Sequence, residues 1–269
     1  ERANRVVHTS VLVSAISSVF LTIFGIIYAK DFLKMMDSPD DVIDLATVYV
    51  QIYFGGIFFN LLYNFVSSVI RANGDTKRPL YILMISGVIN VLLNLLFVVG
   101  FGMSADGVAL ATVISQAFSA IAVMYILFKE TGPLNFSFDK LKIDGNVLKE
   151  MILIGLPSGI QSAFFSISNV IVQKSVNGFG STIIAGNSTA SNLEGFVHVS
   201  MNSVYQASLN FTSQNYGAKK TKNMKMVLIY SLCFVFVIGA VLGSVFYLLG
   251  PYLAKFYTTD PEVIKYALN

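Results

Sequence analysis

Glu194 is the only acidic residue within the long apolar stretches of this 269-residue chain. Polar residues recur around it three or four positions apart, which places them along one face of a helix. A carboxylate near the middle of a bilayer costs about 2.5–3.5 kcal/mol on insertion scales, so a segment that serves only as an anchor has no use for it. The stripe consists of Asn187, Ser191, Glu194, His198, Asn202, Gln206 and Asn210.

This polar stripe predicts a cavity inside a membrane bundle, and therefore transport. In that interpretation Glu194 accepts a proton, and His198, one helical turn away, tunes or shares it. The structural alternative is a neutral Glu194 that is hydrogen-bonded to amide side chains of other helices and holds the bundle together.

Composition assigns the chain to a membrane. It is 55% hydrophobic and 12% charged, with a mean hydropathy of +0.69, whereas soluble domains carry about 25% charged residues. Apolar runs of about 20 residues predict an all-α fold, a polytopic bundle of transmembrane helices. The expected spans are residues 8–29, 46–70, 80–101, 107–128, 151–173, 183–214 and 226–249, seven in all.

Charge placement supports the weakest of these spans, residues 183–214, whose hydropathy the polar stripe dilutes. With a cytoplasmic N-terminus, most of the 18 lysines and arginines fall on alternate loops, which is the positive-inside pattern. Without a span at 183–214, the cluster Lys219–Lys225 would lie outside and break the pattern.

The hydrophilic stretch from Lys129 to Glu150 splits the chain into residues 1–128, a cytoplasmic linker at 129–150, and residues 151–269. A short repeat supports this division, since DFLKMMDSPDDVIDLA (31–46) and PYLAKFYTTDPEVIKYA (251–267) share the order aromatic–Leu, acidic turn with Pro, Val–Ile, Ala. Such repeats are typical of transporters built from two related bundles. We expect the chain to be an internal piece of a longer protein.

Three further motifs carry a family resemblance: NGDTKRPLYILMISGVINVLLNLLFVVGFGMSADGVALATVISQ (73–116), GLPSGIQ (155–161) and TSQNYGAKK (212–220). They resemble the multidrug and toxic compound extrusion (MATE) transporters of the MOP flippase superfamily. The resemblance implies two pseudo-symmetric six-helix lobes in a V and alternating access. Residues 1–128 would supply helices three to six, and residues 151–269 helices seven to nine and the start of ten.

The resemblance also implies a cation site in the N-lobe, to which Asn90 and Thr112 correspond. Asn94 stands where the family carries an aspartate, and an amide neither takes up a proton nor carries a charge to hold Na⁺. A glutamate that another branch of the family places after the proline of helix seven is also missing, since Phe165 and Ser166 stand there. Glu194 is thus the one candidate for charge coupling in this part of the protein.

Other polar residues of the apolar segments could line a substrate cavity, or could form interhelical hydrogen bonds worth about 0.6–2 kcal/mol each. Pro157 is expected to bend its helix and free a backbone carbonyl near that cavity. The cavity candidates are Asn64, Gln116, Gln161, Asn169, Asn187 and Asn202.

These features predict an antiporter that exports drug-like organic cations by alternating access, coupled to H⁺ or Na⁺ influx, with no other cofactor. We expect a multi-pass monomer in the cell membrane, specifically a bacterial inner membrane. A lipid-linked saccharide flippase is the nearest alternative and would require a more cationic cavity. A non-transporting scaffold or receptor is a second alternative, and it would need no acid at the midplane.

Enzymatic and nucleic-acid functions are disfavoured. The chain has two histidines, His8 and His198, and one cysteine, Cys233, which provide neither a catalytic set nor the ligands of a metal site. The net charge of +3 is small, and the basic residues lie in the loops, so no nucleic-acid partner is expected.

Overall fold

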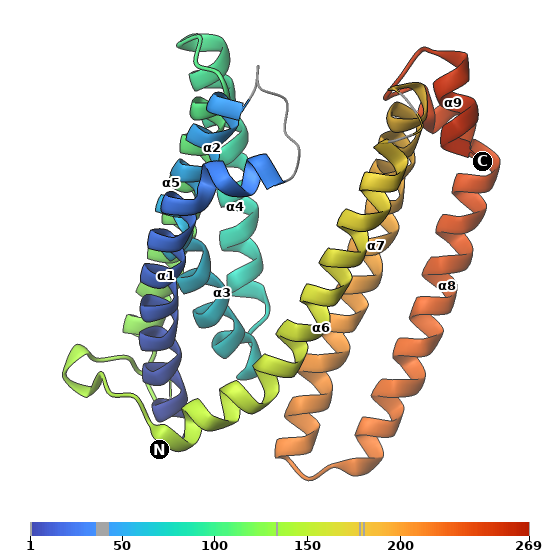
Figure 1. Cartoon of the computed structure of the whole chain (residues 1–269). Helices are drawn as coiled ribbons and strands as arrows, with labels where there is room; N and C mark the ends of the chain where they lie inside the picture. The colour runs from blue at the N-terminus through green and yellow to red at the C-terminus, as the bar shows by residue number, and fades with distance from the viewer. Residues whose placement is uncertain (1, 36–42, 133, 178, 180, 269) are drawn as a thin grey trace. The chain divides into compact units, whose positions relative to one another are not determined.

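The computed structural model describes residues 2–35, 43–132, 134–177, 179 and 181–268, and the regular elements in these ranges are all helices (Figure 1). The predicted all-α class is confirmed. The chain divides into two compact units, Glu1–Ile152 and Leu153–Asn269.

The first unit is a bundle of five helices, with α5 packed against α2, α3 and α4, and α1 against α2 and α3 (Figure 1). Its core contains Val66 and Ile70 of α3 and Val123 and Leu127 of α5. Large apolar side chains also cover the outer faces of the helices, as expected where hydrocarbon replaces water. The helices are α1 Arg2–Met35, α2 Ile43–Gly55, α3 Ile57–Ala72, α4 Lys77–Asn94 and α5 Ala105–Lys129.

The predicted single span at 46–70 is wrong in one respect, because α2 and α3 are two helices bent by 43°. The break falls at the pair Gly55–Gly56, and glycine pairs are a common cause of sharp kinks. A side chain at Gly56 would overlap that of Val113 on α5, so the close approach of α5 requires glycine there.

The predicted span at 80–101 contains a second irregularity. After Asn94 the α-helix α4 continues as a π-helix, η1, over Leu95–Gly100, in which Phe101 N–H donates to the Leu96 carbonyl at 3.0 Å. Short π-helical segments within α-helices frequently lie at functional sites. This one directly follows a residue that the sequence assigns to the cation site.

Five described helices are long and apolar enough to cross a membrane, and the bent pair α2–α3 passes the same test when its two helices are taken together. The further span expected at 183–214 coincides with α7, a continuous helix over Ser181–Gly217. Because the polar stripe lowers its hydropathy, α7 is not among the helices that length and composition alone identify as spans. Its membrane crossing therefore stays a prediction from charge placement.

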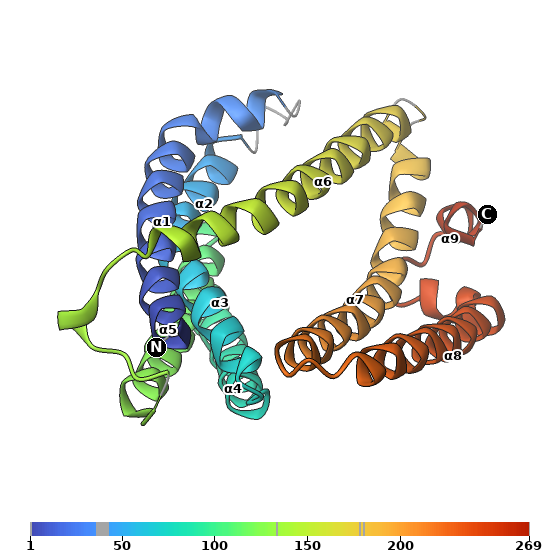
Figure 2. The same ribbon diagram turned by 90° about the horizontal axis from the view of Figure 1, so that it is seen from below.

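The second unit contains α7, α8 (Thr221–Ala254), α9 (Pro261–Leu268) and most of α6 (Gly145–Asn177). Helix α7 packs against both α8 and α9 (Figure 2). At Gly186 of α7 a Cβ would lie 2.7 Å from Cβ of Tyr266 on α9, so glycine permits that contact. Pro157 lies inside a continuous α6, and the bend expected there stays a prediction.

The two copies of the sequence repeat occupy similar places. Helix α1 is followed by α2, and α8 is followed by α9. In the first copy, residues 36–42, with Asp37, Asp40 and Asp41, lie outside the described residues. The structure therefore describes the helical parts of both copies and the connecting turn of the second.

The hydrophilic linker packs against the first unit. Leu134 and Phe136 are 4% and 3% exposed and belong to the same core cluster as Val7 and Leu127. A short 3₁₀ turn, η2 (Phe138–Lys140), follows. The boundary between the two units lies beyond the linker, between Ile152 and Leu153 inside α6.

His8 of α1 holds this linker through Nε2, while Nδ1 contacts a carbonyl of α1 itself. Nδ1 lies 2.8 Å from the Asn4 carbonyl, and Nε2 lies 3.2 Å from Ser137 N–H and 3.1 Å from the Ser137 carbonyl. The ring is 2% exposed and stacks on Phe136 with centroids 5.1 Å apart. Asn4 Nδ2 also donates to the Asn135 carbonyl at 2.6 Å. The bonds of His8 Nε2 and Asn4 Nδ2 join residues about 130 positions apart in the chain.

Asp144 caps the start of α6 and ties it to α1. Its Oδ1 accepts hydrogen bonds from the N–H groups of Val147 at 3.1 Å and Asn146 at 3.0 Å. Its Oδ2 lies 3.3 Å from Arg5, and its own N–H donates to Thr9 Oγ1 at 3.1 Å. The bond from Val147, then that from Asn146 and the charge of Arg5, lower the pKa of Asp144 despite the opposing effect of desolvation.

This lowered pKa predicts a pH-dependent contribution to stability. The contribution of a carboxylate whose pKa is lower in the folded state is complete above its unfolded pKa and disappears as the pH falls through the folded pKa. Asp144→Asn is therefore expected to reduce thermal stability slightly at pH 7, with the difference from wild type shrinking in acid. Size-exclusion chromatography after heating at several pH values measures this. A difference that persists unchanged below the folded pKa would contradict the assignment.

Candidate functional site

The three residues assigned to the N-lobe cation site lie together between α4 and α5. Asn90 Nδ2 is 3.5 Å from Thr112 Oγ1 and 3.3 Å from Ser115 Oγ, and Asn94 Nδ2 donates to Asn90 Oδ1 at 3.1 Å. Ser86 Oγ extends the cluster by donating to the Ser115 carbonyl at 2.7 Å. The grouping arises because Asn90 and Asn94 are one turn apart on α4 and face α5.

Two buried oxygens near this cluster have no hydrogen-bond donor among the described residues, Asn94 Oδ1 and Gln116 Oε1. A buried acceptor without a partner costs about 1–3 kcal/mol, so each is a place where a cation, a water or a substrate donor would be stabilised. Asn94 also lies directly before the π-helix. The cluster itself is electrically neutral, since it consists of amides and hydroxyls.

Sequence reasoning missed the serines of this cluster. Ser86 and Ser115 are 6% and 4% exposed and link the two helices. The signal was available, because Ser86 and Asn90 are four residues apart on one face of α4, as are Ser115 and Ser119 on α5. Serine is so common on helices in contact that the spacing alone did not distinguish a site.

Three predicted cavity residues on α3 and α6 are exposed. Asn64 is exposed on α3, and its Nδ2 donates to Asn60 of the same helix, at 2.9 Å to the carbonyl and 3.0 Å to Oδ1. Gln161 and Asn169 are exposed on α6.

The stripe around Glu194 lies on the unpacked face of α7. Gly186, Thr189 and Leu193 form the buried face. At roughly 100° per residue, Glu194, His198 and Asn202 lie roughly 100–180° around the helix from Leu193, and all three are exposed in the second unit.

Glu194 has no hydrogen-bond or ion-pair partner within the described parts of the chain. Asn187, at the start of the stripe, is half-buried, and its Nδ2 lies 3.5 Å from Gln173 Oε1 on α6. The polar residues therefore lie along one face of α7, as the spacing predicted. No described residue occupies the carboxylate of Glu194, so it is available to a cation or a cationic group.

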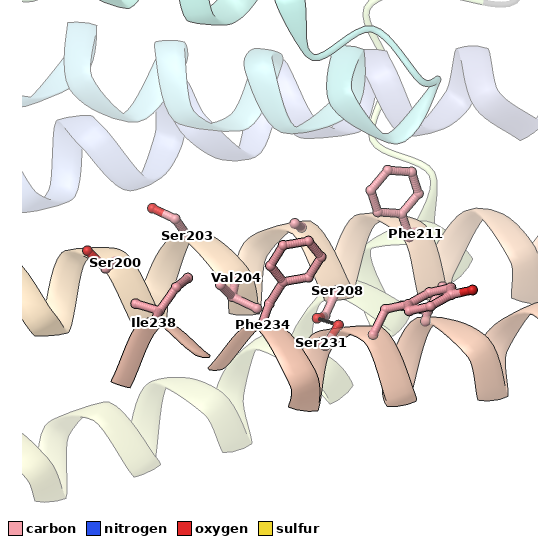
Figure 3. A pocket seen from close by; sticks show the side chains of 11 residues that line it. Ser200, Ser203, Val204, Ser208, Phe211, Ser231, Phe234 and Ile238 are labelled. Atoms are coloured by element: carbon pink, nitrogen blue, oxygen red, sulfur yellow. Dashed lines mark hydrogen bonds between the residues drawn. The ribbon is translucent and has the colours of Figure 1, made fainter. Parts of the chain in front are cut away.

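A groove of about 720 Å³ runs between α7 and α8 (Figure 3). Ser208 and Ser231 face each other across the two helices and share a hydrogen bond. Around them the walls are aromatic and aliphatic, including Phe211, Tyr230 and Phe234. The groove includes none of the predicted cavity residues. Its small side chains, spaced along α7 at Ser200, Ser203, Ala207 and Ser208, were its sequence signal.

The candidate sites thus have distinct chemistry. The α4–α5 cluster offers neutral oxygens, two of them unpartnered; the α7 stripe offers the carboxylate; the groove offers apolar and aromatic surface with hydroxyls. A carboxylate is the group among these that can carry charge coupling, whereas aromatic walls suit flat organic molecules.

Comparison with known proteins identifies the family. The family model described as MatE matches residues 1–96 and 157–269. The chain is 30% identical to "Probable multidrug resistance protein YoeA" of Bacillus subtilis over 276 residues, covering 99% of this chain and 59% of that protein. It is 19% identical to "Multidrug export protein MepA" of Staphylococcus haemolyticus, covering 96% of this chain and 57% of that protein.

Solved structures show the same fold. One, the outward-facing conformation of a multidrug resistance MATE family transporter of the MOP superfamily, matches with a TM-score of 0.87 at 20% identity, over 98% of this chain and 60% of that chain. A MOP superfamily transporter from Pyrococcus furiosus matches with a TM-score of 0.89 at 21% identity, over the same shares. The chain therefore spans about three-fifths of the length of these relatives. It belongs to the MatE family, the multidrug and toxic compound extrusion transporters.

Proposed function

We propose that the protein is a secondary active efflux transporter that exports drug-like organic cations in exchange for H⁺ or Na⁺. The observation that carries this proposal is Glu194, an acid on the unpacked face of α7 that has no partner among the described residues, in a chain that has Asn94 at the family's N-lobe acidic position. Intramembrane acids of this kind are functional by default.

Glu194 is proposed to bind the coupling ion and the substrate cation in turn, with alternating access between the two sides of the membrane. His198, one turn away, would share or tune the proton. The cluster of Asn90, Asn94 and Thr112 would support this exchange with neutral oxygens, by orienting water or a cation rather than by supplying charge.

Substrate selection is proposed to combine this charge with apolar contact. Asn187 and Asn202 extend the stripe on either side of Glu194. Within the first unit, Gln116 offers a buried oxygen that no described donor meets. The names of the two relatives, a probable multidrug resistance protein and a multidrug export protein, support a drug-like substrate class.

The energetics are adequate for this coupling. One coupling ion that enters down about a tenfold concentration gradient releases about 1.4 kcal/mol, which sustains roughly a tenfold gradient of a singly charged substrate cation exchanged one for one. A carboxylate that alternates between a proton and a substrate cation is sufficient to couple the two fluxes.

Cells that express the full-length protein test the proposal. They are expected to accumulate less of a fluorescent cationic dye than control cells, and dissipating the ion gradients is expected to abolish the difference. Unchanged dye accumulation would contradict drug efflux. Export of a lipid-linked saccharide without dye efflux would instead support the flippase alternative.

A further inference from the structure

The connection between α7 and α8 is strongly basic. Lys219, Lys220, Lys222 and Lys225 lie within seven residues, and the sequence contains no Asp or Glu between Glu194 and Asp260. The ion pairs among the described residues are formed by other basic side chains. This end of the helix pair therefore carries positive charge that no part of the described chain neutralises.

One of these lysines also lines an apolar groove. A groove of about 480 Å³ lies beside the seam between α7 and α8, with Met224, Val227 and Leu228 among its apolar lining residues. Thr212, Thr221 and Lys225 supply its polar groups, and Ser208 and Ser231 lie at the seam. The aromatic residues that line the groove of Figure 3 are absent from its lining.

The combination fits an amphipathic anion. An apolar groove on a strongly hydrophobic helix pair accepts an acyl chain. The ammonium group of Lys225, with the hydroxyls of Thr212 and Thr221 in the same groove, binds phosphate. An organic cation is disfavoured by the four lysines, and a fully polar anion gains nothing from the apolar walls. The positive-inside pattern places this end at the cytoplasmic leaflet, where anionic lipids are enriched.

We infer that this groove is a binding site for an anionic phospholipid, whose acyl chain lies along Met224 and Leu228 and whose phosphate is bound by Lys225. This lipid site is separate from the proposed transport site at Glu194. Lys219, Lys220 and Lys222 add long-range attraction, and each lysine near a membrane surface strengthens binding by roughly fivefold.

Lipid retention by the purified full-length protein tests the inference. The protein is incubated with phosphatidylglycerol or with phosphatidylcholine in detergent, and bound lipid is counted by native mass spectrometry. Wild type is expected to retain phosphatidylglycerol and little phosphatidylcholine. Lys225→Gln is expected to reduce phosphatidylglycerol retention by about fivefold, whereas Lys265→Gln on α9, a lysine outside the groove, leaves it unchanged.

A second pair of variants separates the groove from general surface charge. Thr212→Phe fills the groove and keeps every lysine, and Leu228→Asn places an amide in the apolar wall of the groove. Both are expected to reduce the retention of phosphatidylglycerol. Size-exclusion profiles identify which of the two folds. Wild-type retention by a folded variant of this pair would show that surface charge alone attracts the lipid and would overturn the site. Equal retention of both lipids, or no retained lipid because another part of the chain fills the groove, would overturn it as well.

Discussion

Replacing Glu194 with glutamine is expected to abolish ion-coupled dye export while leaving a folded protein. Glutamine preserves size and hydrogen bonding, but it neither binds a proton nor balances a cation. Because Glu194 carries the coupling charge in this proposal, the roughly tenfold dye gradient that about a tenfold ion gradient sustains should fall to about one-fold. Dye gradients across proteoliposomes at a fixed ion gradient, with wild type and variant at matched protein content, measure this loss.

A matched control is available at Glu150, an acid on the first turns of α6 that pairs with Arg2 at 2.7 Å and is 56% exposed. Glu150→Gln removes the same charge by the same substitution and is expected to leave the gradient unchanged. A Glu194→Gln protein that builds a wild-type gradient would reduce Glu194 to a structural residue. It would also favour the interpretation in which its side chain joins an interhelical hydrogen-bond network.

Replacing His8 with alanine is expected to release the linker from α1. The substitution removes the hydrogen bond between Nε2 and the Ser137 backbone and the stacking of the ring on Phe136, and a polar group that loses its partner away from water costs about 1–3 kcal/mol. A loss of about 2 kcal/mol raises the population of the detached linker on the order of thirty-fold. Trypsin cleavage at Lys140 and Lys142, which lie on this segment, is expected to accelerate by a similar factor.

The control for His8 is Arg2→Ala. Arg2 also joins α1 to the last residue of the linker, Glu150, but it is 70% exposed, and exposed ion pairs contribute about 0–1 kcal/mol. Arg2→Ala should therefore accelerate cleavage little. Equal cleavage rates for wild type and His8→Ala would show that Leu134 and Phe136 hold the linker without the histidine.

The sequence predicts the helices well but not their breaks or the linker's contacts. Hydropathy locates most of the helices because lipid requires long apolar segments with satisfied backbones. It does not reveal the break at Gly55–Gly56, which depends on the approach of Val113 from another helix. The docking of the linker was also hidden, because Leu134, Phe136 and His8 are brought together only by tertiary contacts.

The sequence likewise indicated some of the candidate sites and missed others. The grouping of Asn90, Asn94 and Thr112 came from a family resemblance, and the structure brings the three together. The amphipathic stripe of Glu194 follows from helical periodicity alone, which a continuous α7 preserves. The grooves beside α7 and α8 were not predicted: the small residues along α7 are a weak signal, and the walls come from two helices whose facing residues, Ser208 and Ser231, are ordinary in sequence.

Ion-driven dye exchange in proteoliposomes tests the central claim most directly. Vesicles containing the full-length protein and a cationic dye are given an inward proton gradient, an inward Na⁺ gradient, or neither, and dye release and ion entry are recorded together. We expect release that depends on one of the two gradients, is accompanied by entry of that ion, and disappears in the Glu194→Gln protein. Release that is independent of both gradients, or that proceeds normally without Glu194, would contradict the proposal.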